Sequence, residues 1–477
     1  MNDVPLRVRE VQCFEWPFAL RMPFRFGMIT ITHERQAVVR VRVALADGRE
    51  AWGMAAEALA PKWFDKNPAL SDEQNLEQLR RALELARDAY LAHGSGTAFA
   101  HAADSYHSLI KAGAVQGLPP LVTSFGPATL DRAIADALGR LLSGSFFDLV
   151  RGNLLGLEPA KLAPDLAGFD APGFLGALAP LPKVHARHTV GLVDPITGSD
   201  QETRVDDGLP ETLEEVVAAY GQRWFKLKLG GDVAADIARL SRIAAVLDRI
   251  DGPYYATLDG NEQYPDADVV LALLQAMGRE DKLNRLRQSL VFIEQPIRRA
   301  DALARDVAAL DAFAPVILDE SDGEIGIFPR GRALGYRGVS SKSCKGFYKS
   351  LINRMRCAAW NAEVKQQRYF MSAEDLTTVA GLAVQQDLCL VAALGLGHVE
   401  RNGHHFVDGF AGRPAEEAQA FLTAHPDLYH MSSGRVRLRI EGGQISTASL
   451  GVPGFGTAVH PDTARMDAMA PSRWPSG

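Results

Sequence analysis

The sequence predicts an α/β protein, a (β/α)8 barrel preceded by an α+β domain and followed by a segment that packs back on that domain. From about residue 184, short apolar runs alternate with amphipathic helical stretches. Eight such runs occur, with starts roughly 20–40 residues apart. An open doubly wound sheet also alternates but usually stops at about five or six strands, so eight units favour a closed parallel barrel.

Length, composition and charge indicate which broad class of protein the chain belongs to. At 477 residues the chain is too long for one small core, and 47% hydrophobic with 23% charged residues is ordinary for a globular protein. A net charge of −7 argues against a non-specific nucleic-acid binder. Four scattered cysteines without a CxxC pair predict neither a disulfide framework nor structural zinc. No apolar run reaches the roughly 18 residues of a membrane helix, so we expect a cytoplasmic protein without membrane partners.

We expect residues 1–150 to form the α+β domain. VREVQCFEW and QAVVRVRVAL read as strands, with FRFGMITIT (residues 24–32) as the loop between them. Ser71 to Gln74 is a capping-box pattern that opens a helix, and a second helix is expected at 128–142. Residues 151–183, rich in Pro, Gly, Ala and Leu, predict a connection to the barrel.

The barrel is predicted over residues 184–404, and residues 405–477 form the C-terminal segment. Its strand candidates are VHARHTV, RWFKLKL, YYATLD, LVFIEQP, APVILDE, YRGVSSK, QRYFMS and GLGHVE. Stretches such as DVAADIARLSRIAAVLDRI predict the helices between them.

Polar side chains stand where five consecutive strand candidates end, which in a barrel is the edge that carries the active site. They are Lys226 and Lys228, Asp259 and Asn261, Glu294, Asp319 and Glu320, and Lys342.

These residue types suit proton abstraction next to a carboxylate. Lys226 and Lys228 point to the same side of a strand, and ammonium groups held close lower each other's pKa toward a usable base. Three carboxylates from successive strands suit Mg²⁺, which would neutralise a substrate carboxylate and the charge that develops on it. Lys342, across the barrel mouth, would deliver a proton to the opposite face.

Each motif has a plainer interpretation. A KxK pair is usually solvated, EQP is often only a turn, and DES is a common helix start. Five motifs in the right order on consecutive strand ends are much harder to reach by chance.

The order KxK, DxN, EQP, DES, K resembles the enolase superfamily, specifically the muconate-lactonizing-enzyme-like branch of its mandelate racemase/muconate lactonizing enzyme family. The spacings are 31 residues from Lys228 to Asp259, then 35 to Glu294, 25 to Asp319 and 23 to Lys342. DGREAWGMAAE, ATLDRAIADALGRLLSG and the stretch ending GVPGFG also resemble segments of that family, so the resemblance covers nearly the whole chain.

The resemblance implies a capping domain that closes the barrel mouth, an Mg²⁺ cofactor, a small carboxylate substrate and a homo-oligomer. It implies that Asp259, Glu294 and Asp319 bind Mg²⁺, with Asn261 and Glu320 behind them. Lys228 and Lys342 would be the acid/base groups on the two faces of the substrate, and Lys226 would tune Lys228 and touch the substrate carboxylate. The seventh strand offers Glu374 and Asp375 but no His, which favours the lysine-pair branch.

The chain also departs from the family pattern. Lys345-Gly346-Phe347 stands where a Gly-Gly pair is usual, which makes Lys345 a rival of Lys342. The chain is about a hundred residues longer than the branch implies, so no specific substrate is carried over.

Several residues are candidates for substrate contacts. The segment 24–32 is the expected lid, although its phenylalanines are equally well explained as core anchors. Arg298 and Arg299 either hold a second anionic group or are solvated. The predicted substrate contacts are Phe24, Thr30, Glu374, Glu400, Asn402 and His404.

The leading hypothesis is an isomerase (racemase, epimerase or cycloisomerase) that works through an enediolate. A lyase, either a dehydratase or a synthase, would use the same residues, and a non-catalytic metal-binding barrel is the alternative of another class. A glycosidase-type hydrolase needs a facing carboxylate pair, whereas Asp319 and Glu320 are adjacent and point to opposite sides of a strand.

Overall fold

Eight parallel strands form a closed barrel, as the alternating pattern predicts. The computed structural model describes residues 4–27, 29–376 and 378–475. Each strand pairs with the next in chain order, and the last pairs with the first. The strands are β5 (Lys183–Val190), β6 (Trp224–Lys228), β7 (Tyr255–Asp259), β8 (Leu290–Glu294), β9 (Val316–Leu318), β10 (Gly338–Ser341), β11 (Phe370–Ala373) and β12 (His398–Arg401).

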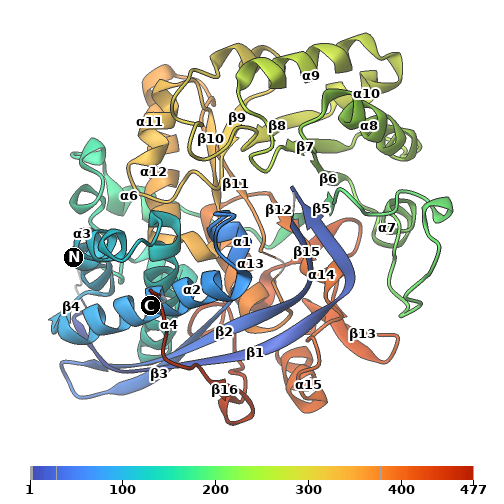
Figure 1. Cartoon of the computed structure of the whole chain (residues 1–477). Coiled ribbons are helices and arrows are strands. Elements are labelled where there is room, and N and C mark those ends of the chain that lie inside the picture. The colour runs from blue at the N-terminus through green and yellow to red at the C-terminus, as the bar shows by residue number, and fades with distance from the viewer. Residues whose placement is uncertain (1–3, 28, 377, 476–477) are drawn as a thin grey trace.

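Helices lie outside the strands (Figure 1). They are α7 (Leu213–Tyr220), α8 (Val233–Leu247), α9 (Ala267–Arg279), α10 (Asn284–Gln288), α11 (Ile327–Ala333), α12 (Phe347–Val364) and α13 (Leu382–Leu394). Apolar residues recur at helical spacing in α8, where Leu240, Ile243 and Leu247 are buried.

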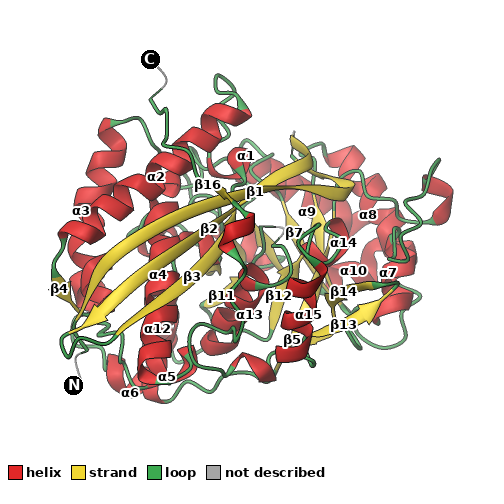
Figure 2. Cartoon of the chain, turned by 90° about the horizontal axis from the view of Figure 1, so that it is seen from below, coloured by secondary structure: helices red, strands yellow, loops and turns green. Residues whose placement is uncertain are grey.

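The N-terminal part is an antiparallel sheet covered by helices (Figure 2). Strands β1 (Leu6–Phe26), β2 (Ile29–Leu45) and β3 (Glu50–Ala58) pair in that order. They pack with α1 (Pro61–Phe64), α2 (Asp72–Ala92), α3 (Ala98–Val115) and α4 (Pro120–Leu142). Gly53 allows α4 to touch β3, because a Cβ there would lie 2.1 Å from the carbonyl oxygen of Ala133.

Helix α2 starts as its capping box predicts. The Ser71 side chain accepts from the backbone N–H of Gln74, and the Gln74 side chain accepts from the backbone N–H of Ser71. The predicted second helix, 128–142, instead starts at Pro120. Proline is favoured in a first helical turn, and burial of Leu121, Val122 and Phe125 outweighs the cost of Pro127 inside the helix.

The predicted loop 24–32 is the tip of a β-hairpin. Phe24, Arg25 and Phe26 pair with Ile31, Thr30 and Ile29, and Gly27 turns the chain at a φ of +52°. Met28 lies outside the described residues. The polar and apolar residues alternate through the segment, which lets the strands continue to the turn.

The chain after the barrel returns to both earlier parts. Strand β15 (Gln444–Ser446) pairs with β5, and β16 (Asp467–Ala468) pairs with β1. Between them and the barrel lie α14 (Gly403–Phe406), α15 (Ala415–Ala424) and a hairpin of β13 (Tyr429–Ser432) and β14 (Arg435–Leu438). The domain boundaries at residues 150, 183 and 404 stay predictions.

Within the part of the chain that the structure describes, no helix is both long and apolar enough to cross a membrane. The four cysteines are all free thiols.

Candidate functional site

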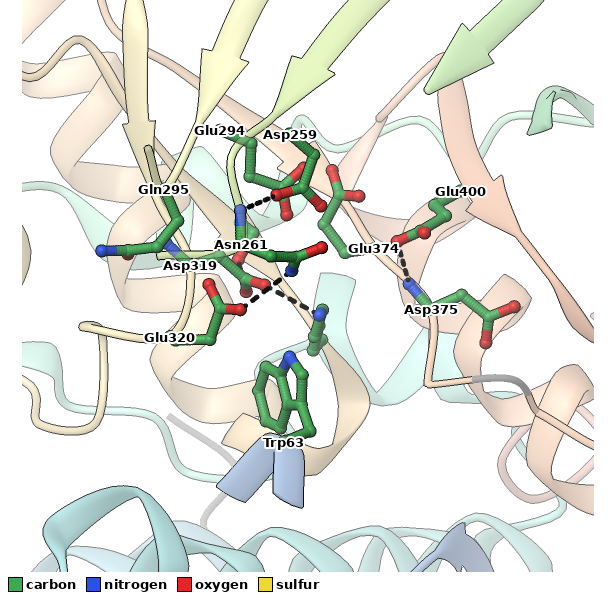
Figure 3. Close-up of polar contacts among 12 residues, drawn as sticks. Trp63, Asp259, Asn261, Glu294, Gln295, Asp319, Glu320, Glu374, Asp375 and Glu400 are labelled. Atoms are coloured by element: carbon green, nitrogen blue, oxygen red, sulfur yellow. Dashed lines mark hydrogen bonds and ion pairs between the residues drawn. The ribbon is translucent and has the colours of Figure 1, made fainter. Parts of the chain in front are cut away.

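Three carboxylates stand side by side at the barrel mouth. Asp259 and Glu294 are the last residues of β7 and β8 and are partners in the strand register, while Asp319 directly follows β9. All three are buried, and they gather at one edge of the barrel (Figure 3).

The turn after β8 holds this arrangement in place. Gln295 adopts a φ of +31°, which L-residues rarely adopt, so its side chain turns back under Asp319. Its Oε1 accepts from the backbone amides of Asp319 (2.9 Å) and Ser321 (3.1 Å), and its Nε2 donates to the Ile297 carbonyl. Sequence reasoning gave Gln295 no role, although it stands in the EQP motif.

Lys226 forms the floor of the site. Its Nζ lies 2.8–3.0 Å from carboxylate oxygens of Asp259, Glu294, Glu374 and Glu400. Burial alone would lower the pKa of Lys226, but these four carboxylates raise it well above its usual value. This differs from the expected mutual lowering by two lysines. Lys226 is fully buried and does not line the cavity, so in this structure its contacts are those of a counter-ion, and its contact with a substrate carboxylate stays a prediction.

Lys228 and Lys342 line one cavity between the barrel and the N-terminal sheet. The Lys228 Nζ is 2.6 Å from Asp259 Oδ2, and the Lys342 Nζ is 2.8 Å from Asp319 Oδ2. Strands β6 and β10 are four positions apart in an eight-stranded ring, so the two lysines enter from opposite sides.

The lysines control the charge of the carboxylates they touch. Burial opposes ionisation of Asp259, but Lys226 and Lys228 outweigh it and lower its pKa. Lys342 and Lys345 likewise hold the pKa of buried Asp319 far below its usual range. Both carboxylates are therefore ionised in the folded protein.

Lys345, the rival of Lys342, lies behind Asp319. Its Nζ is 2.7 Å from Ser340 Oγ and 3.2 Å from Asp319 Oδ1, and its side chain faces a different cavity from that of Lys342. Only Lys342 contacts the aromatic ring of Trp63, with Nζ 4.2 Å from the ring centroid.

Asn261 and Glu320 lie directly behind the three carboxylates (Figure 3). The Asn261 amide donates to Asp259 Oδ1 (2.8 Å), and its Nδ2 donates to Glu320 Oε1 (3.0 Å). Lys66, which follows α1, reaches across to the Asn261 carbonyl at 3.0 Å and to Glu320 at 3.5 Å. Lys66 was not predicted, because nothing in the sequence places that segment beside the barrel.

The donor chemistry fits Mg²⁺, a hard cation that prefers carboxylate oxygens. Glu294 Oε1 has no hydrogen-bond donor among the described residues, and Oε2 contacts only the Lys226 ammonium, without hydrogen-bond geometry. Burial and the nearby Glu374 carboxylate raise the Glu294 pKa well above its usual value, which is the mark of a carboxylate short of positive charge. Across the described residues, no three acidic, His or Cys side chains already converge as a metal cage; lysine ammonium groups lie between the carboxylates instead.

The wall of the cavity away from the lysines is apolar with acidic groups. We call this space the catalytic cavity, after the role proposed for it below. Besides the lysines it is lined by Phe24, Phe26, Ile31, Glu34, Ala60, Trp63, Asn261, Asp375, Leu376, Glu400 and Asn402.

Glu34, on β2, is the most unusual group in this wall. It is buried, its Oε2 has no donor among the described residues, and burial together with Asp375 and Glu57 raises its pKa to about 8. Near pH 7 the Glu34 carboxyl is therefore largely protonated and neutral in the folded protein. Its place in the sequence, in a strand, carried no signal of this.

The predicted substrate contacts divide. Phe24, Glu400 and Asn402 line the catalytic cavity. Thr30 is exposed and does not line it. Glu374 is paired with Lys226 and Arg187 in the floor, where Arg187 and Ser372 hold it below the cavity.

His404 lies outside the catalytic cavity and lines a second one on the far side of α14. Arg299, an alternative anion contact, instead binds Glu262 through Nε at 2.8 Å and the backbone carbonyls of Trp63 and Phe64. It ties α1 to the barrel.

Comparison with solved structures places this fold. Over 98% of this chain it aligns with an enolase from Bradyrhizobium in complex with magnesium and mandelic acid, at 16% identity, a TM-score of 0.59 and 100% coverage of that chain. A muconate lactonizing enzyme from Mycobacterium smegmatis with muconolactone aligns over 97% of this chain and 100% of its own, at 18% identity and a TM-score of 0.59. A dipeptide epimerase from Enterococcus faecalis, complexed with Mg and L-Leu-L-Tyr, aligns over 94% and 99%, at 14% identity and a TM-score of 0.58.

These likenesses confirm the fold that the resemblance implied, a barrel with a capping domain of the mandelate racemase/muconate lactonizing enzyme type. No family model matches the sequence, and no curated protein matches it either.

Proposed function

We propose that this protein is a Mg²⁺-dependent enzyme that moves the α-proton of a small carboxylate, giving racemisation, epimerisation or cycloisomerisation. The observation that carries the proposal is the pair Lys228 and Lys342. They enter one cavity from opposite sides, each within hydrogen-bond distance of a different strand-end carboxylate.

Asp259, Glu294 and Asp319 would hold Mg²⁺, with Asn261 and Glu320 fixing their orientation. When bound, Mg²⁺ supplies a Lewis acid that neutralises the substrate carboxylate and the second charge that develops as its α-proton leaves. The magnesium complexes of the Bradyrhizobium enolase and the dipeptide epimerase support this choice of metal.

The two lysines act on opposite faces of the substrate. One, as the free amine, takes the α-proton from one face of the substrate; the other, as ammonium, donates a proton to the opposite face. Lys228 is paired with Asp259 and Lys342 with Asp319, so Mg²⁺ held by those carboxylates would weaken their hold on the ammonium protons. Lys226 stays charged throughout, because its four carboxylate partners hold its pKa well above the usual value, and its charge offsets part of the negative charge of the floor.

The cap completes the site by excluding water. Phe24, Phe26 and Trp63 cover the lysines from the side of the N-terminal sheet. A dry cavity strengthens every charge interaction within it and protects the reactive carbanion from solvent protons. We also propose that the protein forms a homo-oligomer and acts in the cytoplasm.

The decisive experiment is proton NMR in D2O with Mg²⁺ and a panel of N-acyl amino acids, dipeptides, muconates and sugar acids. We expect one class to lose its α-proton signal, and EDTA to stop the loss. A product with inverted configuration at the α-carbon, or with a new ring, identifies an isomerase, whereas an unsaturated product with loss of water identifies a lyase.

Lys183→Ala is the matched control, since Lys183 is an exposed lysine at the N-terminal end of β5, away from the barrel mouth. Exchange that survives EDTA, or that survives loss of both Lys228 and Lys342, contradicts the proposal.

A further inference from the structure

A second cavity lies on the other side of α14. It has a volume of about 250 Å³ and is enclosed by the loop 208–210, the end of α7, α14 and the β13–β14 hairpin. We call it the hairpin cavity. Among the described residues, none that lines it also lines the catalytic cavity.

Arg437 lines this space and carries a donor without an acceptor. The side chain is buried, with 4% exposed. Its Nε donates to Asp408 Oδ1 at 3.0 Å and its Nη2 to the Asp207 carbonyl at 2.9 Å, whereas its buried Nη1 has no acceptor among the described residues. A buried guanidinium N–H without an acceptor is costly, so it marks a place where an acceptor belongs.

His404 faces the same cavity with both ring nitrogens buried and without a partner in the described chain. Its ring packs edge-on against Tyr220 at 5.4 Å. Burial lowers the pKa of His404 well below its usual value, so the ring is neutral and offers one N–H.

The arginines around the hairpin cavity are paired with aspartates. Asp408 serves both Arg435 (2.7 Å) and Arg437 (2.9 Å). Arg21 is paired with Asp207, and Arg401 with Asp387. At the hairpin two arginines therefore share one aspartate, and one of the two, Arg437, lines the cavity.

The remaining lining is largely apolar. Val384, Val407, Leu438 and Ile440 contribute aliphatic surface. An apolar body with one or two placed polar groups is the usual character of a small-molecule site. As a guide to size, an apolar cavity of about 150 Å³ holds benzene.

We propose that the hairpin cavity is a second ligand site that binds a small organic carboxylate with an apolar body. The Arg437 Nη1 and the His404 ring N–H donate to the carboxylate, and the aliphatic side chains take the body. This site does not depend on the proposed catalytic function, because it needs neither Mg²⁺ nor the lysines.

The probe is 4-fluorobenzoate, followed by ¹⁹F NMR with the full-length protein in EDTA. Removing divalent metal suppresses carboxylate binding in the catalytic cavity, so the two sites are separated. We expect saturable binding with a dissociation constant of about 1 mM or tighter. The neutral 4-fluorobenzamide and the cationic 4-fluorobenzylamine should bind at least about tenfold more weakly.

Ala219→Trp tests the location. Ala219 lines the hairpin cavity from α7 and is exposed, so an indole there fills the space without disturbing the core. Ala218→Trp, one residue earlier on the same helix and also exposed, does not face the cavity and is the matched control. We expect at least about a tenfold loss for Ala219→Trp and none for Ala218→Trp.

Arg437→Gln tests the donor and should lose the preference for benzoate over benzamide. Three results would each overturn the proposal: no saturable benzoate binding in EDTA, equal binding by wild type and Ala219→Trp, or equal binding of the three probes. Catalytic inactivity with benzoate binding intact would count against the proposed function alone.

Discussion

The two cavities on either side of α14 differ in the cations that line them. At the catalytic cavity the cations are lysines, and Asp259 and Asp319 each accept from more than one ammonium group. At the hairpin cavity they are arginines: Arg437 shares Asp408 with Arg435, and Arg401 pairs with Asp387.

This difference separates chemistry from binding. A lysine can lose its proton when its surroundings change, whereas an arginine stays charged at any ordinary pH. A site built on lysines can therefore move protons, and a site built on arginines can only hold an anion. The predictions below test that contrast, beginning with the largest expected effect.

Loss of either cavity-lining lysine should abolish turnover to product. We expect Lys342→Ala and Lys228→Ala each to lower the rate of product formation about 10³-fold, in the range of general acid–base catalysis. The measurement is product formation by proton NMR on the responsive substrate, and α-proton exchange should persist only in the variant that keeps the lysine facing that proton. Activity retained in Lys342→Ala but lost in Lys345→Ala would show that Lys345 holds the catalytic position.

Removing the floor counter-ion should affect folding rather than chemistry alone. Lys226→Met leaves four buried carboxylates without their shared ammonium, and breaking such a buried network costs about 3–5 kcal/mol. Urea unfolding measures the loss. Lys228→Met, which removes an ammonium with one carboxylate partner, is the control and should cost clearly less.

Magnesium should stabilise the folded protein through the three strand-end carboxylates. At about 100 times its dissociation constant a ligand adds about 2.7 kcal/mol, visible as a rise in Tm. Asp319→Asn should remove this rise, and Asp268→Asn, at an exposed position on α9, should keep it. An equal rise in both variants would locate the metal elsewhere.

Glu34 should make stability fall as the pH rises. Its pKa is about 8 in the folded protein and about 4.5 in the unfolded chain, so folding favours the protonated form. That contribution is complete below pH 4.5 and is lost as the pH rises through 8. We expect Glu34→Gln to be more stable than wild type by about 2 kcal/mol at pH 6 and similar to it at pH 4.5.

Denaturant unfolding at both pH values provides the test. Glu202→Gln, at an exposed carboxyl, serves as the control. Parallel pH profiles for wild type and Glu34→Gln would show that Glu34 is ionised in the folded protein.

The barrel strands, and the order of polar residues at their ends, were predictable because both depend on local pattern. The run LVFIEQP shows a buried strand and the place where it ends, so it positions Glu294 without knowledge of the rest of the fold. The same applies to Asp259 and Asp319, whose side chains the structure brings together.

The cap side of the site was not predictable in the same way. Glu34, Trp63 and Lys66 reach the site only because one domain docks on another, and no periodicity in their own segments indicates that contact. The role of Lys226 depends on Glu374 and Glu400, which are more than a hundred residues away in the chain. The position of His404 depends on the turn of α14, which directs neighbouring side chains into different cavities.

The ion pairs of Arg299 and Lys66 with Glu262 limit how the N-terminal domain of this protein can be exchanged for another. Both cations share Glu262, and through it the short helix α1 is fastened to the turns that orient Asn261 and Glu320. A chimera that exchanges the N-terminal domain for another would leave Glu262 and Glu320 facing an unmatched surface. Domain grafting on this scaffold therefore has to carry the segment 61–66 with the barrel, as part of the same module.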